Sequence, residues 1–159
     1  MQMRKIPMAA LAELLQVQLE KGGKAKLTVT GNSMQPMFCH GRDSVMLVPL
    51  SEKQKTGDII LYRRKNGQYI LHRILELTET GYMCCGDNQT EKETVEQEQL
   101  IAVVESFTRK GKDHTLDDWT CRLYTAVWLG CFPLRKCYVT VRRTGGKILR
   151  KLKRLKKRK

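Results

Sequence analysis

Short runs of alternating apolar and polar residues fill the middle of this 159-residue chain, and they constrain its fold more than any other feature. The first run, KAKLTVT at 24–30, directs Ala25, Leu27 and Val29 to one face, as a half-buried strand does. Five further runs follow: SVMLVP, GDIILYR, QYILHRILEL, GYMCCGD and LIAVVESF. Most are separated by turn sequences such as HGRD, KTGD, KNGQ and TETG. We therefore predict a mainly β core over 24–108, either a barrel or a sandwich.

Segments with helical periodicity flank this core. Pro7 suits a first helical turn, and leucines at 11, 14, 15 and 19 then recur until Gly22 and Gly23. This pattern predicts an amphipathic helix over 7–21 within an N-terminal unit of residues 1–23. After the core, two apolar stripes at helical spacing predict a helical extension over 109–159; they consist of Trp119, Leu123 and Val127, and of Ile148, Leu149, Leu152 and Leu155.

The net charge of +14 belongs entirely to the C-terminal extension. Residues 1–118 contain 16 basic and 16 acidic residues, whereas 119–159 contain 14 basic residues and no acidic one. Nine of the basic residues lie between 147 and 159, around the second apolar stripe, which is typical of a basic amphipathic helix on an anionic membrane surface. The residues expected to contact the membrane are Trp119, Trp128, Lys147, Arg150, Lys151, Lys153, Arg154, Lys156 and Lys157.

Two further roles are open to the basic tail. A nucleic-acid patch would suit the lysine run, although the tail has no groove-reading motif and no interleaved stacking aromatics. The tail could also be a solvated charge run whose leucines pack on the β core. We favour the membrane surface over both.

The rest of the composition indicates a cytoplasmic protein associated peripherally with the inner face of the membrane. The N-terminus does not resemble a cleavable signal, and the longest apolar stretch, LYTAVWLGCF at 123–132, is about half the ~20 residues of a membrane-spanning helix. The six cysteines show no secretory disulfide framework and no CxxC pair. We therefore predict reduced thiols, no metal site and no cofactor.

The segment TGNSMQPMF at 30–38 places a serine where a nucleophile would be exposed. Gly31 permits an unusual backbone before Ser33, and Pro36 disfavours continuation as a helix. A serine nucleophile also needs a base to accept its proton and amide donors for the oxyanion. The alternative is a turn serine that caps its own loop. Met34 and Met37 would either line a substrate groove or pack in the core.

Candidate partners for Ser33 follow later in the chain. His72 lies mid-strand in GQYILHRI, on the face of Ile70 and Ile74, where an imidazole without a partner would be costly. Asp87 and Glu93 follow in CCGDNQTEKE, and either carboxylate would suit the orientation of a histidine base. The alternatives are a structural histidine in the sheet and a solvated acidic loop.

Four of these segments, in this order, resemble the sequence boxes of signal peptidase I and its relatives. GNSMQP is similar to the Gly-x-Ser-Met-x-Pro box, GDIILYR to the strand that follows it, and LHRI and GDN to the histidine and acidic boxes of the endoplasmic-reticulum and archaeal type. The resemblance covers about 24–104 and implies that superfamily's mainly β peptidase core. It implies Ser33 as nucleophile and oxyanion donor through its backbone amide, His72 as general base and Asp87 as acidic partner, with Glu93 as the other candidate.

The implied function is a serine endopeptidase that removes leader or signal-type peptides, with a leader-bearing precursor as substrate and an exporter as a possible partner. The second oxyanion donor is unassigned, because Gly31 stands where some bacterial members have a hydroxyl. Two alternatives remain: a self-cleaving regulator of the SOS-repressor kind, which would need an Ala-Gly site that this chain lacks, and a non-catalytic module that binds peptide, membrane or nucleic acid.

Overall fold

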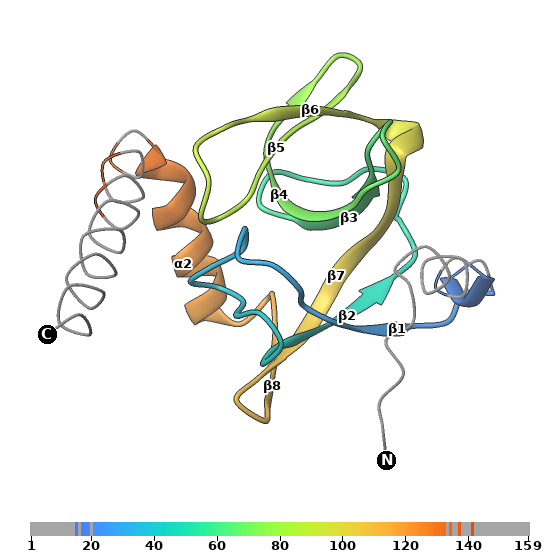
Figure 1. The fold of residues 1–159 in the computed structure, drawn as a ribbon, viewed down its shortest axis with the longest axis horizontal. Coiled ribbons are helices and arrows are strands. Elements are labelled where there is room, and N and C mark those ends of the chain that lie inside the picture. The colour runs from blue at the N-terminus through green and yellow to red at the C-terminus, as the bar shows by residue number, and fades with distance from the viewer. Residues whose placement is uncertain are drawn as a thin grey trace, which may run out of the picture.

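A curled antiparallel β-sheet forms the body of the protein (Figure 1). The computed structural model describes residues 21–132 together with 15, 17–19, 134, 137 and 141. The strands are β1 (Ala25–Thr28), β2 (Ser44–Val48), β3 (Ile59–Arg63), β4 (Tyr69–Thr78), β5 (Gly81–Cys85), β6 (Glu93–Glu96), β7 (Leu100–Arg109) and β8 (Lys112–Thr115). They are arranged in the order β1-β2-β7-β3-β4-β5-β6, and β8 pairs with β7. The predicted mainly β core is confirmed.

Each of the six predicted runs contains a strand, and the structure adds two strands that the sequence did not indicate. In β6 (ETVE) only Val95 is buried, so the segment resembled an acidic loop. The polar sequence of β8 (KDHT) resembled a linker, yet it forms a hairpin with the end of β7. The sheet therefore continues beyond the expected core boundary at residue 108.

The flanking helices are described only in part. Residues 15 and 17–19 are helical, and Leu15 and Leu19 are buried against the β1 side of the core. The rest of the expected helix over 7–21 lies outside the described residues. Helix α2 (Trp119–Gly130) corresponds to the first C-terminal apolar stripe. The second stripe, and the basic residues from Lys147 to Lys157, also lie outside the described residues.

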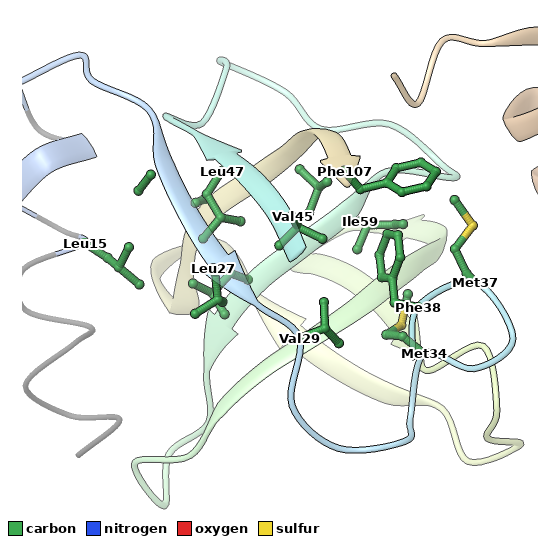
Figure 2. Packing of buried hydrophobic residues seen from close by; sticks show 14 of the residues in the cluster. Leu15, Leu27, Val29, Met34, Met37, Phe38, Val45, Leu47, Ile59 and Phe107 are labelled. Carbon is green, nitrogen blue, oxygen red and sulfur yellow. The ribbon is translucent and has the colours of Figure 1, made fainter. Parts of the chain in front are cut away.

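Strand β3 separates two apolar clusters and is buried on both faces. Ile59 and Leu61 join a larger cluster, part of which is shown in Figure 2, whereas Ile60 and Tyr62 join a smaller one. Alternate side chains of this strand therefore enter two different apolar clusters, rather than a core on one side and solvent on the other. Because β4 pairs with β3, its successive side chains also reach opposite cores.

Helix α2 lies beside the sheet (Figure 1), close to the segments that join β1 to β2 and β5 to β6. A hydrogen bond from the Tyr124 hydroxyl to Asp87 links the helix to the second of these segments. In the described part of the chain, no helix has both the length and the hydropathy that a membrane crossing requires.

Candidate active site

The loop that carries Ser33 is held in shape at both ends. Gly31 has φ +83°, a left-handed conformation that glycine adopts without strain, and its amide donates to His40 Nδ1 at 2.9 Å. On the far side, the Phe38 amide donates to the Met34 carbonyl at 2.9 Å. Ser33 itself is half-buried, whereas Gly31 before it is exposed and Phe38 after it is buried.

The two methionines beside Ser33 anchor the loop in the larger core. Met34 and Met37 are buried, and Figure 2 shows them next to Phe38, which packs edge-on against Phe107 with ring centroids 5.2 Å apart. Of the two roles predicted for these methionines, the structure supports core packing.

Asn88, of the GDN segment, clamps the Ser33 loop to the end of β5. Its amide donates to the Ser33 carbonyl at 2.7 Å, and its Nδ2 donates to the Asn32 carbonyl at 3.0 Å. Two carbonyls of the Ser33 loop are therefore fixed by one residue from a distant segment of the chain.

Gly86 marks the point where the serine and histidine segments meet. A Cβ atom at this residue would lie 2.7 Å from the Ser33 carbonyl oxygen and 3.0 Å from His72 Nε2. Real Cβ atoms do not approach backbone oxygens so closely, so only glycine fits here. The Ser33 carbonyl oxygen and His72 Nε2 are therefore both close neighbours of Gly86. Within the described residues, the polar partners of the His72 ring are Tyr62 and Glu93, and the Ser33 hydroxyl is not among them.

His72 is held by its other ring nitrogen. It pairs with Ile60 in the β3–β4 ladder and is 2% exposed. Its Nδ1 lies 2.9 Å from Glu93 Oε1 and 3.1 Å from the Tyr62 hydroxyl. Tyr62 and Glu93 come from β3 and β6, so the strands on both sides of β4–β5 contribute to the histidine's orientation.

The hydrogen-bond network fixes the tautomer of His72. The Tyr62 hydroxyl donates its only proton to Glu93 Oε1, so the contact between Tyr62 and Nδ1 needs a proton on the ring. Nδ1 therefore carries the hydrogen and donates to Glu93. The lone pair is on Nε2, the nitrogen that faces Gly86 and Ser33, which is the arrangement that a general base requires.

Glu93 is shared between His72 and Arg64. Arg64 binds both carboxylate oxygens, with Nε 2.8 Å from Oε2 and Nη2 2.9 Å from Oε1. Burial alone would raise the pKa of Glu93, but the hydrogen bonds from Arg64 and Tyr62 hold that pKa below its usual value. Glu93 is therefore ionised at neutral pH. Burial is the main cause that raises the pKa of Tyr62, and the hydrogen bond to Glu93 raises that pKa further. Tyr62 therefore keeps its proton.

His72 is neutral at pH 7. Burial lowers the pKa of its ring and outweighs the opposing attraction of Glu93, while the positive charge of Arg64 adds to the lowering. A neutral imidazole has a lone pair on Nε2 and is able to accept a proton there, whereas an imidazolium is protonated on both nitrogens and is not.

Asp87, the acid that the resemblance implies as the partner of His72, contacts Arg73 instead. Arg73 Nε and Nη2 lie 3.0 and 2.9 Å from its two carboxylate oxygens, and both side chains are almost fully buried. Tyr124 donates to the same carboxylate at 3.1 Å. In the structure the carboxylate that contacts His72 is that of Glu93, the alternative candidate. Asp87 lies on the Arg73 side of β4.

Helix α2 also contacts Arg73 directly. Arg73 Nη1 donates to Thr125 Oγ1 at 3.0 Å and to the Gly57 carbonyl at 2.9 Å, and Nη2 lies 3.4 Å from Met37 Sδ. Burial alone would lower the pKa of Arg73, but Asp87 raises it. Arg73 thus remains charged and joins β4, α2 and the end of the Ser33 loop.

Four residues of this site were not predicted as functional: Tyr62, Arg64, Arg73 and Asn88. Tyr62 lies two residues after Ile60, the ladder partner of His72, so the two side chains share a face. That signal depends on the register between two strands, which the sequence does not specify. Asn88 stands in the GDN segment itself, where only Asp87 was predicted to have a role.

The two tryptophans of α2 differ in exposure. Trp119 is 74% exposed, whereas Trp128 is half-buried and stacks on Tyr124 with ring centroids 5.5 Å apart. In the described part of the chain, no three His, Cys, Asp or Glu side chains are grouped closely enough to hold a metal ion. Comparisons of this chain with protein-family models, curated proteins and solved structures found no match.

Proposed function

We propose that the protein is a serine endopeptidase that resembles signal peptidase I. Ser33 is the nucleophile, His72 the general base and Glu93 the acid that orients His72. The observation that carries the proposal is the close approach at Gly86. A Cβ atom at this residue would lie 2.7 Å from the Ser33 carbonyl oxygen and 3.0 Å from His72 Nε2. Two segments that are distant in sequence thus lie next to Gly86, and the ring nitrogen that lies there is the unprotonated one of a neutral histidine.

The reaction would follow the usual course of acyl transfer. His72 Nε2 accepts the proton of the Ser33 hydroxyl as Ser33 Oγ attacks the scissile carbonyl, and the Ser33 amide donates to the developing oxyanion. The protonated His72, stabilised by Glu93, then gives its proton to the leaving amine. Water attacks the acyl-enzyme after losing a proton to the same Nε2, and Ser33 recovers its hydrogen when the acid product leaves.

The substrate we propose is an extended leader segment with small residues before the scissile bond. Among the described strands, β1 and β6 end the sheet, so each has an edge free to pair with an extended peptide. The preference for small residues comes from the resemblance to signal peptidases, as does the removal of a leader from an exported peptide. The basic C-terminal sequence would bring the enzyme to the inner, anionic face of the membrane.

Mass spectrometry of leader-bearing precursors incubated with the full-length protein tests this proposal. Wild type should cleave after a small residue, and both Ser33→Ala and His72→Ala should reduce the rate by about 10³-fold or more. Ser44→Ala, a change at a half-buried serine in β2, is the matched control and should cleave normally. Cleavage that persists in both site variants would refute the mechanism.

A further inference from the structure

The outer face of α2 is apolar and exposed. Trp119, Leu123 and Val127 follow one another at intervals of four residues and are 74%, 55% and 53% exposed. Leu134, beyond the end of α2, is 70% exposed. A helix on the surface of a soluble domain ordinarily turns such a stripe toward the core.

The inner face of α2 packs on the larger core through Cys121 and Tyr124, and polar contacts link it to β4 and to the residues after β5. Cys121 is the only buried residue of the helix. The Tyr124 hydroxyl donates to Asp87 at 3.1 Å, and Thr125 Oγ1 accepts from Arg73 at 3.0 Å. Asp87 follows Gly86, and Arg73 follows His72, so both contacts end one residue away from the point where the serine and histidine segments meet.

The charge of the sequence from α2 onward indicates the partner of this helix. From residue 119 to the end of the sequence there are 14 basic residues and no acidic one. An apolar stripe within a strongly cationic segment matches the boundary between anionic headgroups and acyl chains. A nucleic acid would satisfy the charges but would leave the apolar stripe in water.

We propose that an anionic lipid surface docks on the outer face of α2 and, by stabilising the helix, strengthens its contacts with Arg73 and Asp87. An isolated helix of 12 residues is marginal in water, and α2 has a single buried residue. The fraction of molecules in which α2 is folded against the sheet therefore depends on what covers its outer face. Lipid would therefore favour the state in which Tyr124 and Thr125 contact the Arg73–Asp87 ion pair. The effect on cleavage rests on the proposed function, whereas the effect on structure does not.

Tryptophan fluorescence tests the docking step without reference to activity. The chain has two tryptophans, so Trp128→Phe in the full-length protein leaves Trp119 as the only reporter. Vesicles of phosphatidylglycerol and phosphatidylcholine should shift its emission to the blue, and vesicles of phosphatidylcholine alone should not. The change Leu123→Gln with Val127→Gln should abolish the shift, whereas Leu77→Gln, at a 54% exposed leucine of β4, should preserve it.

Two results would overturn the docking step. Vesicle binding without a change in Trp119 emission would show that the basic tail binds lipid and α2 does not. An equal shift with a DNA duplex would show that the surface recognises polyanions rather than lipid.

Hydrogen exchange of residues 86–92 tests the coupling step. Anionic vesicles should slow exchange in this segment about fivefold or more in wild type. Tyr124→Phe keeps the aromatic ring but removes the bond to Asp87, so it should retain the Trp119 shift and lose most of the slowing. Exchange that vesicles leave unchanged in wild type would overturn the coupling.

Cleavage of a leader-bearing precursor in the same samples separates this inference from the proposed function. Docking and slowed exchange without any cleavage would support lipid coupling and refute the peptidase. Cleavage that is equally fast with and without vesicles, together with unchanged exchange, would leave the peptidase intact and overturn the coupling. Stimulation of about fivefold or more in wild type, reduced in Tyr124→Phe, would support both.

Discussion

Two neighbouring residues of β4, His72 and Arg73, each pair with a carboxylate that follows β5 in the chain, but the two pairs differ in kind. Arg73 and Asp87 form a two-pronged ion pair whose side chains are 1% and 0% exposed. His72 and Glu93 meet at one ring nitrogen, and Glu93 keeps 26% of its side chain exposed. The raised pKa of Arg73 keeps the guanidinium of the first pair charged, whereas the second pair contains a neutral histidine that is able to change its protonation state.

The difference arises because successive residues of a strand face opposite sides of the sheet. His72 faces the smaller core with Tyr62, whereas Arg73 faces Met37 and α2. A fully buried guanidinium needs a complete set of acceptors, and Asp87, Gly57 and Thr125 supply them. The base proposed here needs an unprotonated nitrogen, and His72 Nε2 lies next to Gly86, which the Ser33 carbonyl also approaches. One strand thus carries a structural ion pair on one face and the proposed reactive site on the other.

The largest effect we expect is on stability, from removal of Asp87. Asp87→Ala leaves the buried charge of Arg73 without its counter-ion and should lower the free energy of unfolding by about 3–5 kcal/mol. Urea denaturation at pH 7 measures this loss. The control is Glu76→Ala, which removes an exposed ion pair with Lys92 and should cause no measurable change. Equal losses of stability in the two variants would contradict the requirement of buried Arg73 for its counter-ion.

The next effect is on catalysis, from Glu93→Gln. An amide keeps the size of Glu93 but no longer stabilises the imidazolium that forms during the reaction, so kcat/KM should fall by about 10²-fold. Steady-state cleavage assays measure this fall, and thermal unfolding shows whether the variant is folded. An unchanged rate in Glu93→Gln, with a large loss in a folded Asp87→Asn variant, would transfer the role of acidic partner to Asp87.

A smaller effect should follow from Gly86→Ala, which leaves both pairs in place. The added methyl group would meet the Ser33 carbonyl at 2.7 Å and His72 Nε2 at 3.0 Å, so these groups must separate. We expect about a tenfold fall in kcat/KM and a loss of about 1–3 kcal/mol in stability from overpacking. Gly130→Ala is the control, because its Cβ would meet nothing within 4 Å. Full activity of Gly86→Ala would contradict the close approach of the two segments.

The smallest effect concerns the pH dependence of cleavage. His72 must be neutral to act as base, and its lowered pKa extends activity below the pH at which an ordinary histidine becomes protonated. Arg64→Gln removes a positive charge that lowers the pKa of His72, so the acid limb of the kcat/KM profile should move to higher pH. Lys65→Gln, at an exposed pair with Glu96, should leave the limb in place. Movement of the limb to lower pH in Arg64→Gln would contradict the assignment of His72 as base.

The sequence by itself determined the mainly β architecture, because alternation of apolar residues between turn signals depends only on local periodicity. The six predicted runs, and the first helical stripe after the core, are present as strands and as α2. Strands β6 and β8 were missed, because ETVE and KDHT have too few apolar residues to show a period and form by pairing with longer neighbours.

Only the tertiary structure decided which candidate residues meet. The sequence supplied a serine, a histidine and two carboxylates in order, but the choice between Asp87 and Glu93 depends on which face of β4 each carboxylate reaches. That choice follows from strand register and from the path of the chain after β5, where Asn88 binds the Ser33 loop. A one-residue change in register would exchange the faces of His72 and Arg73. The local pattern of residues determines the strands and helices, whereas long-range strand pairing determines which side chains come into contact.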